Sequence, residues 1–481
     1  MNTEIKKNLI AGQWVGGDDV VKNTSPSNLG DVVGYYVRAS GQQVAEAASA
    51  AKAALPGWAR LGIQQRSEIL DRVGDALMTR KDEIGRILAR EEGKTLPEAI
   101  GETARAAQIF KFFAGEALRI SGDSIASVRP GVGVTVSRDP VGVVGLVTPW
   151  NFPIAIPAWK IAPALAYGNT VVFKPADLTP GSAHLLAEIL HQAGIPAGVF
   201  NLVMGRGSVV GNAMVQSPDV DAISFTGSVP VGRALAASAA QGLKKTQLEM
   251  GGKNPMVVMD DADLDVATDV CVNGAFYSTG QRCTASSRLI VHRKVYDVFV
   301  EKLSKAVADL TVGDALAHET QIGPVVSENQ LHNNLSYVNI AREEGATVLG
   351  GEQLERDTKG FYQKPALFLN ASNEMRSSRE EIFGPCASVI AADDFEHALA
   401  LANDSEFGLS AGICTSSLSH AAAFQRQAAA GMVMVNLPTA GVDYHVPFGG
   451  CKGSSHGSRE QGRYASEFYT TVRTSYCLAE V

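Results

Sequence analysis

Between residues 141 and 241 the sequence alternates between short apolar runs and longer amphipathic segments. Short runs without charged positions are typical of parallel strands that are covered on both faces. They predict strands at Val141–Val147, Thr170–Phe173, Val199–Val203 and Ala222–Phe225. The segments between them predict helices at Gly181–Ala193, Ser208–Gln216 and Val231–Gln241. A second series of the same kind begins after Glu249 and runs to about Val435, so doubly wound α/β units are predicted.

The segments outside these two series have different patterns. Helical periodicity from about residue 42 to residue 120 predicts an all-helical block near the N-terminus. Ile125–Arg138 is predicted to form an exposed hairpin, and Thr470–Leu478 alternates like a strand. A late strand far from its neighbours often completes a sheet elsewhere or in another subunit. Both segments are therefore predicted to bridge subunits.

Composition narrows the class of protein. The chain has 481 residues, 45% hydrophobic and 19% charged, which predicts an ordinary soluble protein of two or three domains. Its net charge of −8, without a local Lys/Arg cluster, argues against nucleic acid or an anionic membrane as a partner. Residues 141–173 contain Lys160 as their only charge, but prolines interrupt the segment and no membrane span is expected.

Cysteine and histidine spacing gives two further expectations. The six cysteines lack C-x-x-C pairing, which is typical of reduced thiols in a cytosol. The N-terminus has no apolar region of a secretory signal, so a cytoplasmic location is expected. The nine histidines show no metal-ligand spacing, and no metal is expected.

Cys283 has a distinctive sequence context. It follows Gly280-Gln281-Arg282 in a run of small polar residues, and the apolar segment Leu289-Ile290-Val291 comes next. This context predicts a thiol on a loop between a helix and a strand. A thiol near a cation and among backbone N–H groups can have a lowered pKa and act as a nucleophile. Most cysteines are buried hydrophobic residues instead, so the interpretation depends on partners elsewhere in the chain.

Three segments at predicted strand ends could bind a dinucleotide. Gly205-Arg-Gly207-Ser-Val-Val-Gly211 has glycines at a strand–helix turn, although its spacing is G-x-G-x-x-x-G. Phe225-Thr226-Gly227-Ser228 places hydroxyls and N–H groups at a helix start, which suits phosphate. Lys174-Pro175-Ala176-Asp177 places a lysine and an acid where ribose hydroxyls are held. Each signal is weak alone, and together they favour a nucleotide site.

Two further residues could serve a nucleophilic cysteine. Glu249 precedes a glycine pair and could act as a general base, although an arbitrary glutamate is usually a solvated surface group. Asn151 lies between prolines at a strand end, where its amide could donate to a developing oxyanion.

Six motifs in order resemble the aldehyde dehydrogenase superfamily over essentially the whole chain. They are Pro149-Trp-Asn-Phe-Pro153, Phe225-Thr-Gly-Ser228, Leu248-Glu-Met-Gly-Gly252, Gly280-Gln-Arg-Cys283, Glu380-Glu-Ile-Phe-Gly-Pro385 and Pro447-Phe-Gly-Gly450. One tetrapeptide would be weak evidence, whereas six in this order are highly specific. The resemblance implies an α/β fold with a Rossmann-type NAD(P)-binding domain, an α/β catalytic domain and a small β oligomerisation arm.

The resemblance also implies domain boundaries. Residues 1–120 and 140–248 would form the NAD(P)-binding domain, and residues 249–436 the catalytic domain. Residues 121–139 and 464–481 would form the arm, and residues 437–463 would return to the NAD(P)-binding domain. A homodimer or a homotetramer is expected.

The resemblance assigns chemical roles to matching residues. Cys283 would attack the aldehyde carbon, and the Asn151 side chain and the Cys283 backbone N–H would hold the resulting alkoxide, which expels hydride to the nicotinamide. Glu249 would then activate water to hydrolyse the thioester, and Lys160 and Glu460 would relay protons away. Cofactor contacts fall on Thr148, Trp150, Lys174, Asp177, Gly207, Gly211, Phe225, Thr226, Gly227, Ser228, Glu381 and Phe383. Because the Asp177 carboxylate would repel a 2′-phosphate, NAD is favoured, with NADP possible.

For the substrate, the resemblance implies an aldehyde that carries a carboxylate. Relatives that oxidise succinate semialdehyde have arginines where this chain has Trp159 and Tyr277. Arg282 is instead expected to meet the distal carboxylate or a 2-keto oxygen, with a solvent-facing or locally paired arginine as the equal alternative. The best match is oxidation of α-ketoglutaric semialdehyde to α-ketoglutarate in sugar or sugar-acid catabolism, with succinate and glutarate semialdehydes as alternatives. Phe110, Phe113, Trp159, Tyr277 and Phe448 are expected to line an access tunnel and the pocket.

Two other classes of function are weighed against this one. A CoA-acylating aldehyde dehydrogenase would lack the general base, so Glu249 argues against it. A non-catalytic structural protein on the same scaffold would have no reason to combine Cys283, Asn151 and Glu249.

Overall fold

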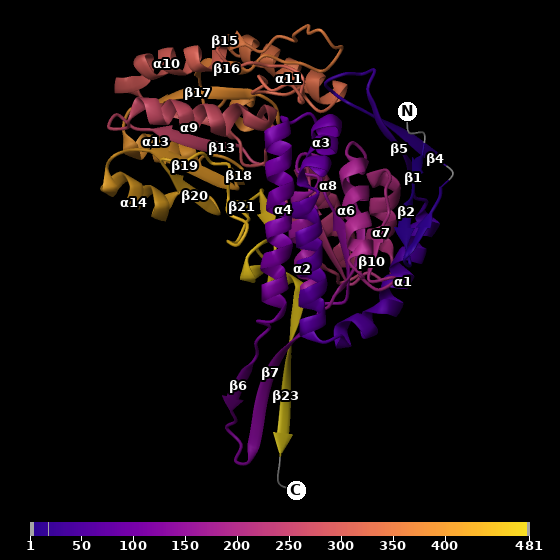
Figure 1. The fold of residues 1–481 in the computed structure, drawn as a ribbon. Helices are drawn as coiled ribbons and strands as arrows, with labels where there is room; N and C mark the ends of the chain where they lie inside the picture. The colour runs from indigo at the N-terminus through magenta and orange to yellow at the C-terminus, as the bar shows by residue number, and fades with distance from the viewer. Residues whose placement is uncertain (1–3, 18, 479–481) are drawn as a thin grey trace.

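The computed structural model describes residues 4–17 and 19–478 and consists of three parts (Figure 1). Two α/β bodies, each built on a mainly parallel sheet, lie against each other, and a long three-stranded arm projects away from them. The residues predicted at the extreme ends, 1–3 of the first domain and 479–481 of the arm, lie outside the described residues, as does residue 18.

The first body contains an eight-stranded sheet in the order β22-β12-β11-β8-β9-β10-β2-β3. Its five central strands are parallel, and the edge strands are antiparallel. The bounds are β2 Asn8–Ile10, β3 Gln13–Val15, β8 Val143–Val147, β9 Thr170–Lys174, β10 Phe200–Leu202, β11 Ala222–Thr226, β12 Lys245–Glu249 and β22 Ser455–His456.

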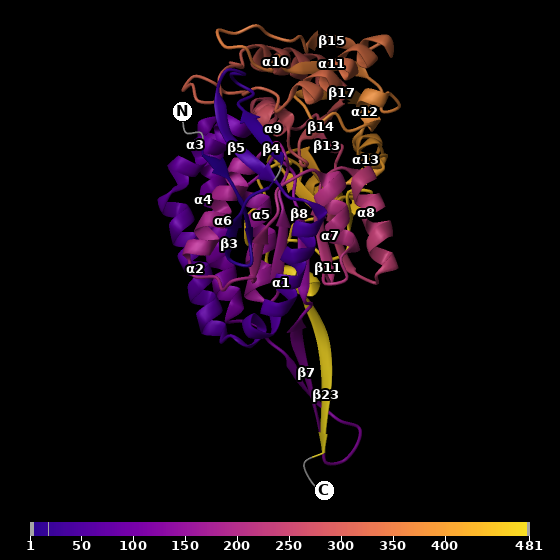
Figure 2. The same ribbon diagram turned by 90° about the vertical axis from the view of Figure 1, so that its right-hand side faces the viewer.

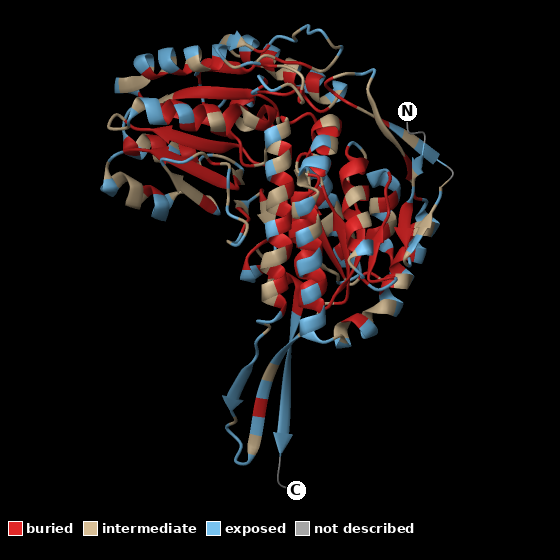
Figure 3. Cartoon of the chain, viewed as in Figure 1, coloured by how far each residue is buried: buried red, intermediate tan, exposed pale blue. Residues whose placement is uncertain are grey.

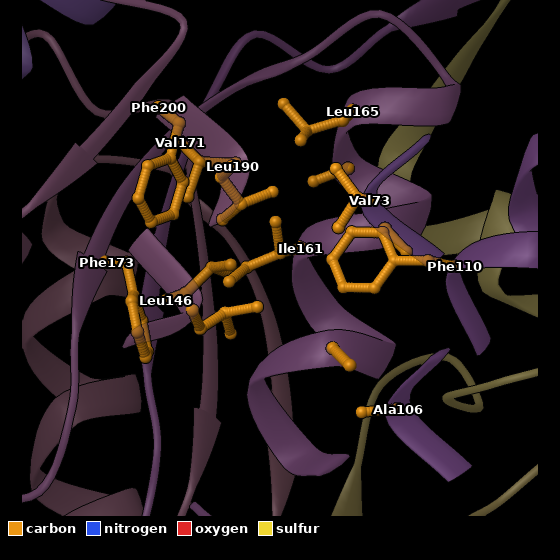
Figure 4. Close-up of a cluster of buried hydrophobic side chains, with 14 of the residues drawn as sticks. Val73, Ala106, Phe110, Leu146, Ile161, Leu165, Val171, Phe173, Leu190 and Phe200 are labelled. Atoms are coloured by element: carbon orange, nitrogen blue, oxygen red, sulfur yellow. The ribbon is translucent and has the colours of Figure 1, made fainter. Parts of the chain in front are cut away.

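Helices cover both faces of this sheet, which is why β8 (VVGLV) is entirely apolar and the strands beside it, β9 and β11, are largely so. Leu146, Phe173 and Phe110 belong to the core on one face, shown in Figure 4, while Val147 and Val172 belong to the core on the other. Figure 2 shows α2, α4 and α6 on one side and α7 and α8 on the other. The helices are α1 Gly41–Arg60, α2 Ile63–Thr79, α3 Lys81–Glu92, α4 Leu96–Ala117, α5 Ala155–Ala166, α6 Pro180–Gln192, α7 Asn212–Gln216 and α8 Val229–Gln241.

The strand order reverses between β8 and β11. From β8 the chain proceeds through α5 to β9 and then to β10, and it returns to place β11 on the opposite side of β8. In open α/β sheets, ligands bind outside the carboxyl ends of the strands at such a reversal. A single π-helical turn, Gly207–Gly211, lies between β10 and α7, where the sequence predicts the start of a helix.

The second body contains a seven-stranded sheet in the order β15-β16-β17-β14-β13-β19-β20. Only the β15–β16 pair is antiparallel. Its strands are β13 Asn254–Val258, β14 Ser286–His292, β15 Thr347–Gly350, β16 Ala366–Ala371, β17 Cys386–Ala392, β19 Ser410–Cys414 and β20 Met432–Val435. Its helices are α9 Leu264–Phe276, α10 Tyr296–Ala308, α11 Glu328–Glu343, α12 Arg376–Arg379, α13 Phe395–Asn403 and α14 Leu418–Gln427.

The arm consists of β6 (Asp123–Ala126), β7 (Val132–Pro140) and β23 (Thr470–Leu478), all antiparallel. Most of its residues are exposed, β6 and β23 almost throughout, in contrast to the buried strands of the two bodies (Figure 3). The exposed hairpin predicted at Ile125–Arg138 is present, and the strand predicted at Thr470–Leu478 pairs with it.

Smaller elements complete the chain. A three-stranded sheet of β1 (Ile5–Lys6), β5 (Val32–Arg38) and β4 (Asp19–Thr24) precedes the helical block. Two-residue strands β18 (Phe407–Gly408) and β21 (Cys451–Lys452) pair with each other, and α15 spans Ser466–Tyr469. In the described part of the chain, no helix is long and apolar enough to cross a membrane.

Candidate active site

The loop that carries Cys283 contains a tight left-handed turn. Helix α9 ends at Phe276, and Ser278 and Thr279 follow with φ of 52° and 58°. Non-glycine residues rarely adopt this conformation, so other contacts must stabilise it. The Glu98 carboxylate on α4 accepts hydrogen bonds from the Ser278 backbone N–H at 2.8 Å and its hydroxyl at 3.0 Å. One body therefore anchors the cysteine loop of the other.

Cys283 lies just beyond this turn, and its backbone carbonyl accepts a 2.8 Å hydrogen bond from Asn254 Nδ2. Burial, followed by the charges of Glu381 and Glu249, raises the pKa of Cys283 to about 12. The sequence-based expectation of a lowered pKa is wrong for this state. The cation next to the cysteine in sequence, Arg282, is paired with Glu98 at 3.2 Å, and carboxylates act on the thiol instead.

Asn151 is buried and lies against the cysteine loop. Its Nδ2 donates a 2.9 Å hydrogen bond to the Gln281 carbonyl, two residues before Cys283. An amide nitrogen carries two hydrogens, so the second remains to be donated elsewhere. The predicted oxyanion donor and the predicted nucleophile are thus brought together from sequence positions far apart.

Glu249 is the last residue of β12 and is paired in register with Thr226 at the end of β11. Its carboxylate is 2% exposed and accepts a 2.5 Å hydrogen bond from the Ser455 hydroxyl. Burial, and then the negative charge of Glu460, raise the pKa of Glu249 well above its usual range. A raised carboxyl pKa suits a general base that must hold a proton near neutral pH.

Lys160 and Glu460 form a buried ion pair behind this carboxylate. Lys160 Nζ also donates to Ser224 Oγ at 2.7 Å, and Ser224 donates to the Gln247 side chain at 2.9 Å. The second carboxylate oxygen of Glu460 is buried without a hydrogen-bond partner among the residues that the structure describes.

A cavity of about 390 Å³ reaches Cys283. The predicted pocket residues Trp159 and Phe448 line it and stack with ring centroids 5.2 Å apart. Its lining is Lys94, Glu98, Gly101, Glu102, Arg105, Phe152, Ala155, Trp159, Asn273, Ser278, Arg282, Cys283, Thr284, Pro438, Ala440, Gly441, Val442 and Phe448.

Three predicted pocket residues do not line this cavity. Phe110, labelled in Figure 4, and Phe113 are fully buried in the core between α4 and the first sheet. They lie on the apolar face of α4, where burial between helices outweighs exposure to a pocket. Tyr277 packs against the core of the second body instead.

The charged residues of the cavity are mostly paired. Lys94 lies 2.6 Å from Glu102, and Arg282 lies 3.2 Å from Glu98. Arg105 has no ion pair among the described residues; it donates to Gln461 at 3.3 Å, and its Nε is buried without a partner.

The carboxyl ends of the first sheet fit a dinucleotide. The hydroxyls of Thr148 and Thr226, at the ends of β8 and β11, are buried and have no hydrogen-bond partner within residues 4–17 and 19–478. Lys174, at the end of β9, is 6% exposed, and burial lowers its pKa. A largely apolar cavity of about 490 Å³ opens beside them, lined by Val147, Gly207, Ser208, Gly211, Asn212, Val215, Phe225, Pro230, Val231, Ala234, Leu235 and Ser238. Unpaired polar groups beside an apolar slot suit a ribose, phosphates and a base.

The remaining predicted cofactor residues have defined neighbours. Glu381 accepts a 2.8 Å hydrogen bond from the Gly252 N–H, and burial raises its pKa to about 7. Trp150 and Phe383 meet edge to face with centroids 5.4 Å apart. Asp177 lies 3.3 Å from Arg38.

Two further predicted cofactor residues lie at the start of α8. Ser228 is its N-cap residue, and its side chain makes no capping hydrogen bond. Gly227 precedes it, where a side chain would collide with the Phe225 ring. A search of the described residues finds no group of His, Cys, Asp and Glu that could hold a metal ion.

Sequence reasoning missed a row of charged residues on α4. Glu98, Glu102 and Arg105 are spaced by four and three positions, so they share one face of a helix that is otherwise apolar near its start. That spacing is the signal that could have identified them. Thr439 was also missed; its hydroxyl ties the loop of residues 437–446 to the Thr284 carbonyl at 2.6 Å.

Comparisons with known proteins agree with the motifs. Residues 14–475 match the model of the aldehyde dehydrogenase family. An α-ketoglutaric semialdehyde dehydrogenase of Bacillus subtilis is 46% identical over 474 residues, covering 98% of this chain and 97% of that protein. An NADP-dependent succinate-semialdehyde dehydrogenase of Escherichia coli is 38% identical and covers 97% of this chain and 96% of its own length.

Solved structures agree as well. An NAD-dependent aldehyde dehydrogenase from Sinorhizobium meliloti superposes with a TM-score of 0.97 at 36% identity, covering 100% of this chain and 96% of the other. The predicted family and fold class are confirmed. The chain belongs to the aldehyde dehydrogenase family.

Proposed function

We propose that this chain oxidises an aldehyde with a distal carboxylate to the corresponding acid, and that α-ketoglutaric semialdehyde, which yields α-ketoglutarate, is its substrate. The observation that carries the proposal is Arg105, a cation in the aldehyde cavity without a carboxylate partner among the described residues. The name of the Bacillus subtilis relative supports the same substrate. A role in sugar or sugar-acid breakdown is part of the same proposal.

The charge balance of the cavity supports this substrate class. Lys94 is neutralised by Glu102, and Arg282 by Glu98. Arg105 has no carboxylate at ion-pair distance among the described residues; Glu102 and Asp443 act on its charge from further away, and burial lowers its pKa. Burying a lone charge is costly unless a partner arrives. A substrate carboxylate, held by the planar guanidinium fork, would supply that partner.

The anchoring role expected for Arg282 is reassigned to Arg105 in this proposal. Arg282 lines the cavity, but its guanidinium already contacts Glu98 and the Asn273 carbonyl. Its charge helps to anchor the cysteine loop. Succinate and glutarate semialdehydes, which carry the same carboxylate on chains of different length, remain the alternative substrates.

The residues around Cys283 support oxidation through a covalent thioester. The thiol, protonated at neutral pH in this state, loses its proton to solvent water, and the thiolate attacks the aldehyde carbon. The second Asn151 amide hydrogen and the Cys283 backbone N–H donate to the resulting oxyanion. NAD or NADP, when bound at the carboxyl ends of the first sheet, supplies the hydride acceptor. Glu249 then takes a proton from the water that hydrolyses the thioester.

The contacts of Lys160 and Glu460 support a role for this pair in carrying away the proton that Glu249 takes. Glu460 acts electrostatically on Glu249, and one of its oxygens is buried without a hydrogen-bond partner. An acceptor with an unused lone pair can take a hydrogen bond or a proton without breaking an existing contact.

The environment of Asp177 supports a preference for NAD. Its carboxylate follows β9, where the ribose of a dinucleotide is recognised, and would repel a 2′-phosphate. Arg38, 3.3 Å away, is shared with Asp19 at 3.2 Å, so its charge is already engaged.

The arm supports assembly into a homodimer or homotetramer. Large apolar side chains on it are exposed: Ile125 52%, Val128 101%, Val472 63%, Tyr476 62% and Leu478 54%. The β23 strand is also an unpaired sheet edge, which natural proteins rarely leave uncovered. Sedimentation velocity of the full chain against a chain lacking residues 470–481 tests this proposal.

The substrate proposal is tested with Arg105→Met, using α-ketoglutaric, succinate and glutarate semialdehydes and propanal. We expect kcat/KM to fall about 10- to 100-fold for the preferred semialdehyde, the cost of a lost charged hydrogen bond, and to change little for propanal. Arg282→Lys, which keeps the charge beside Glu98, is the matched control and should affect all four aldehydes equally. An equal loss for propanal with Arg105→Met would contradict the anchor.

Product analysis tests the rival classes. A requirement for CoA would favour the acylating enzymes, and absence of NADH with every aldehyde would favour a non-catalytic protein. With water as acyl acceptor, the free acid forms without CoA.

A further inference from the structure

A second buried ion pair lies beside Asn151 and has no part in the reaction described above. Lys94 Nζ and Glu102 Oε2 are 2.6 Å apart, and their side chains are 1% and 2% exposed. Both residues line the aldehyde cavity, close to the residues that would perform the chemistry.

The pair contacts both ends of the short segment 151–155. Lys94 Nζ donates a 2.6 Å hydrogen bond to the Asn151 backbone carbonyl. Glu102 Oε1 accepts hydrogen bonds from the backbone N–H groups of Ile154 at 2.9 Å and Ala155 at 3.1 Å. These are first-turn donors of α5, which has no side-chain cap of its own.

The hydrogen-bonding groups of the pair are largely occupied. Both carboxylate oxygens of Glu102 accept hydrogen bonds. The Lys94 ammonium is engaged by Glu102 and the Asn151 carbonyl, and the Phe152 ring centroid lies 4.0 Å from it. The pair is therefore poorly suited to bind a substrate group, although it lines the cavity.

We propose that Lys94 and Glu102 are positioning residues, which set the Asn151 amide at the place where the oxyanion forms. This inference rests on the oxidation proposed above. The Asn151 main chain is fixed by Lys94, and its side chain is fixed by the Gln281 carbonyl. Because the main chain and the side chain of Asn151 are both held, its second amide hydrogen points in one fixed direction. Electrostatic stabilisation of a transition state requires such a fixed donor.

The test is Glu102→Gln in the full-length protein, with rapid-mixing measurement of the first turnover of NADH. We expect the first-turnover rate to fall about 10- to 100-fold, because a donor displaced by a fraction of an ångström loses much of its effect. The loss is equal for α-ketoglutaric semialdehyde and propanal, because the oxyanion is common to both. The Kd for NAD and the rate of Cys283 alkylation by iodoacetamide stay within about twofold, because neither depends on Asn151.

Two further variants separate positioning from folding. Lys94→Met with Glu102→Gln removes both charges, so that no lone buried charge remains, and should show the same kinetic loss. Glu91→Gln is the matched control: Glu91 is also buried and caps α6 by accepting from Gly181 N at 2.8 Å and Ser182 N at 2.7 Å. Because α6 carries none of the proposed catalytic residues, the first-turnover rate of Glu91→Gln should equal that of the wild type.

Three results would count against the inference or its basis. A first-turnover rate within about twofold of the wild type in the folded double variant would overturn positioning. A loss confined to the carboxylated aldehyde would also overturn it, because Lys94 would then be a substrate anchor. No NADH from the wild-type protein would overturn the proposed function instead.

Discussion

Two buried lysine–glutamate pairs border the proposed active site, and they differ in how far their hydrogen-bonding groups are used. In the Lys94–Glu102 pair, both carboxylate oxygens accept hydrogen bonds, and the lysine also holds a backbone carbonyl. In the Lys160–Glu460 pair, one Glu460 oxygen accepts a hydrogen bond from the Lys160 ammonium, and the other is buried without a partner in the described part of the chain.

The difference separates two tasks for the same pair of residue types. A pair with its groups engaged resists movement, which suits the positioning of Asn151. A pair with an unused acceptor beside a carboxyl of raised pKa can exchange protons, which suits a relay from Glu249. Burial and charge are nearly the same in the two pairs, so the carboxylate oxygen without a hydrogen bond is what distinguishes Lys160–Glu460 from Lys94–Glu102.

The largest expected effect comes from removing the base that the second pair serves. Glu249→Gln retains the shape and the Ser455 contact but cannot accept a proton. We expect steady-state turnover to fall about 10³-fold. A first-turnover burst of about one NADH per site remains, because the thioester still forms. An unchanged steady-state rate would show that another group activates the water.

An intermediate effect is expected in the pH dependence of turnover. The base form of Glu249 is the carboxylate, so kcat rises with pH through its raised pKa. Glu460→Gln removes a negative charge that raises this pKa, so the rise should move to lower pH. Lys160→Met removes a positive charge that lowers it, so the rise should move to higher pH. Shifts in the same direction for both variants would contradict the relay.

The smallest effect is expected when the first pair is altered in the same experiment. Neither Lys94 nor Glu102 is among the groups that act most on the Glu249 pKa. Glu102→Gln should therefore lower kcat at every pH while the pH midpoint stays where it is in the wild type. A displaced midpoint in the pH profile would show that Glu102 acts on the Glu249 pKa. The two pairs would then form one electrostatic network.

Parts of the fold and site could be predicted from local pattern. Apolar runs identified β8, β9 and β11, because strands covered on both faces are largely apolar. Thr470–Leu478 was predicted with its observed bounds. The motifs containing Asn151 and Glu249 also sit at strand ends in the structure, and parallel strands bring such ends together.

Other features could not be predicted because they depend on pairing through space. Phe110 and Phe113 look like pocket aromatics in sequence, and only helix packing turns them into the core. Cys283 follows an arginine, yet Glu98, 184 positions from that arginine, neutralises its charge. Burial and nearby carboxylates therefore dominate the environment of the Cys283 thiol and raise its pKa.

The sequence by itself thus determined the family, the order of the elements and the residues proposed for the chemistry, since these depend on local periodicity and on motifs. The tertiary structure decided which of the cavity cations lacks an ion pair among the described residues and which buried pair has a carboxylate oxygen without a hydrogen bond. Net charge at a point is a sum over neighbours from different elements, and the linear order of residues does not contain that sum.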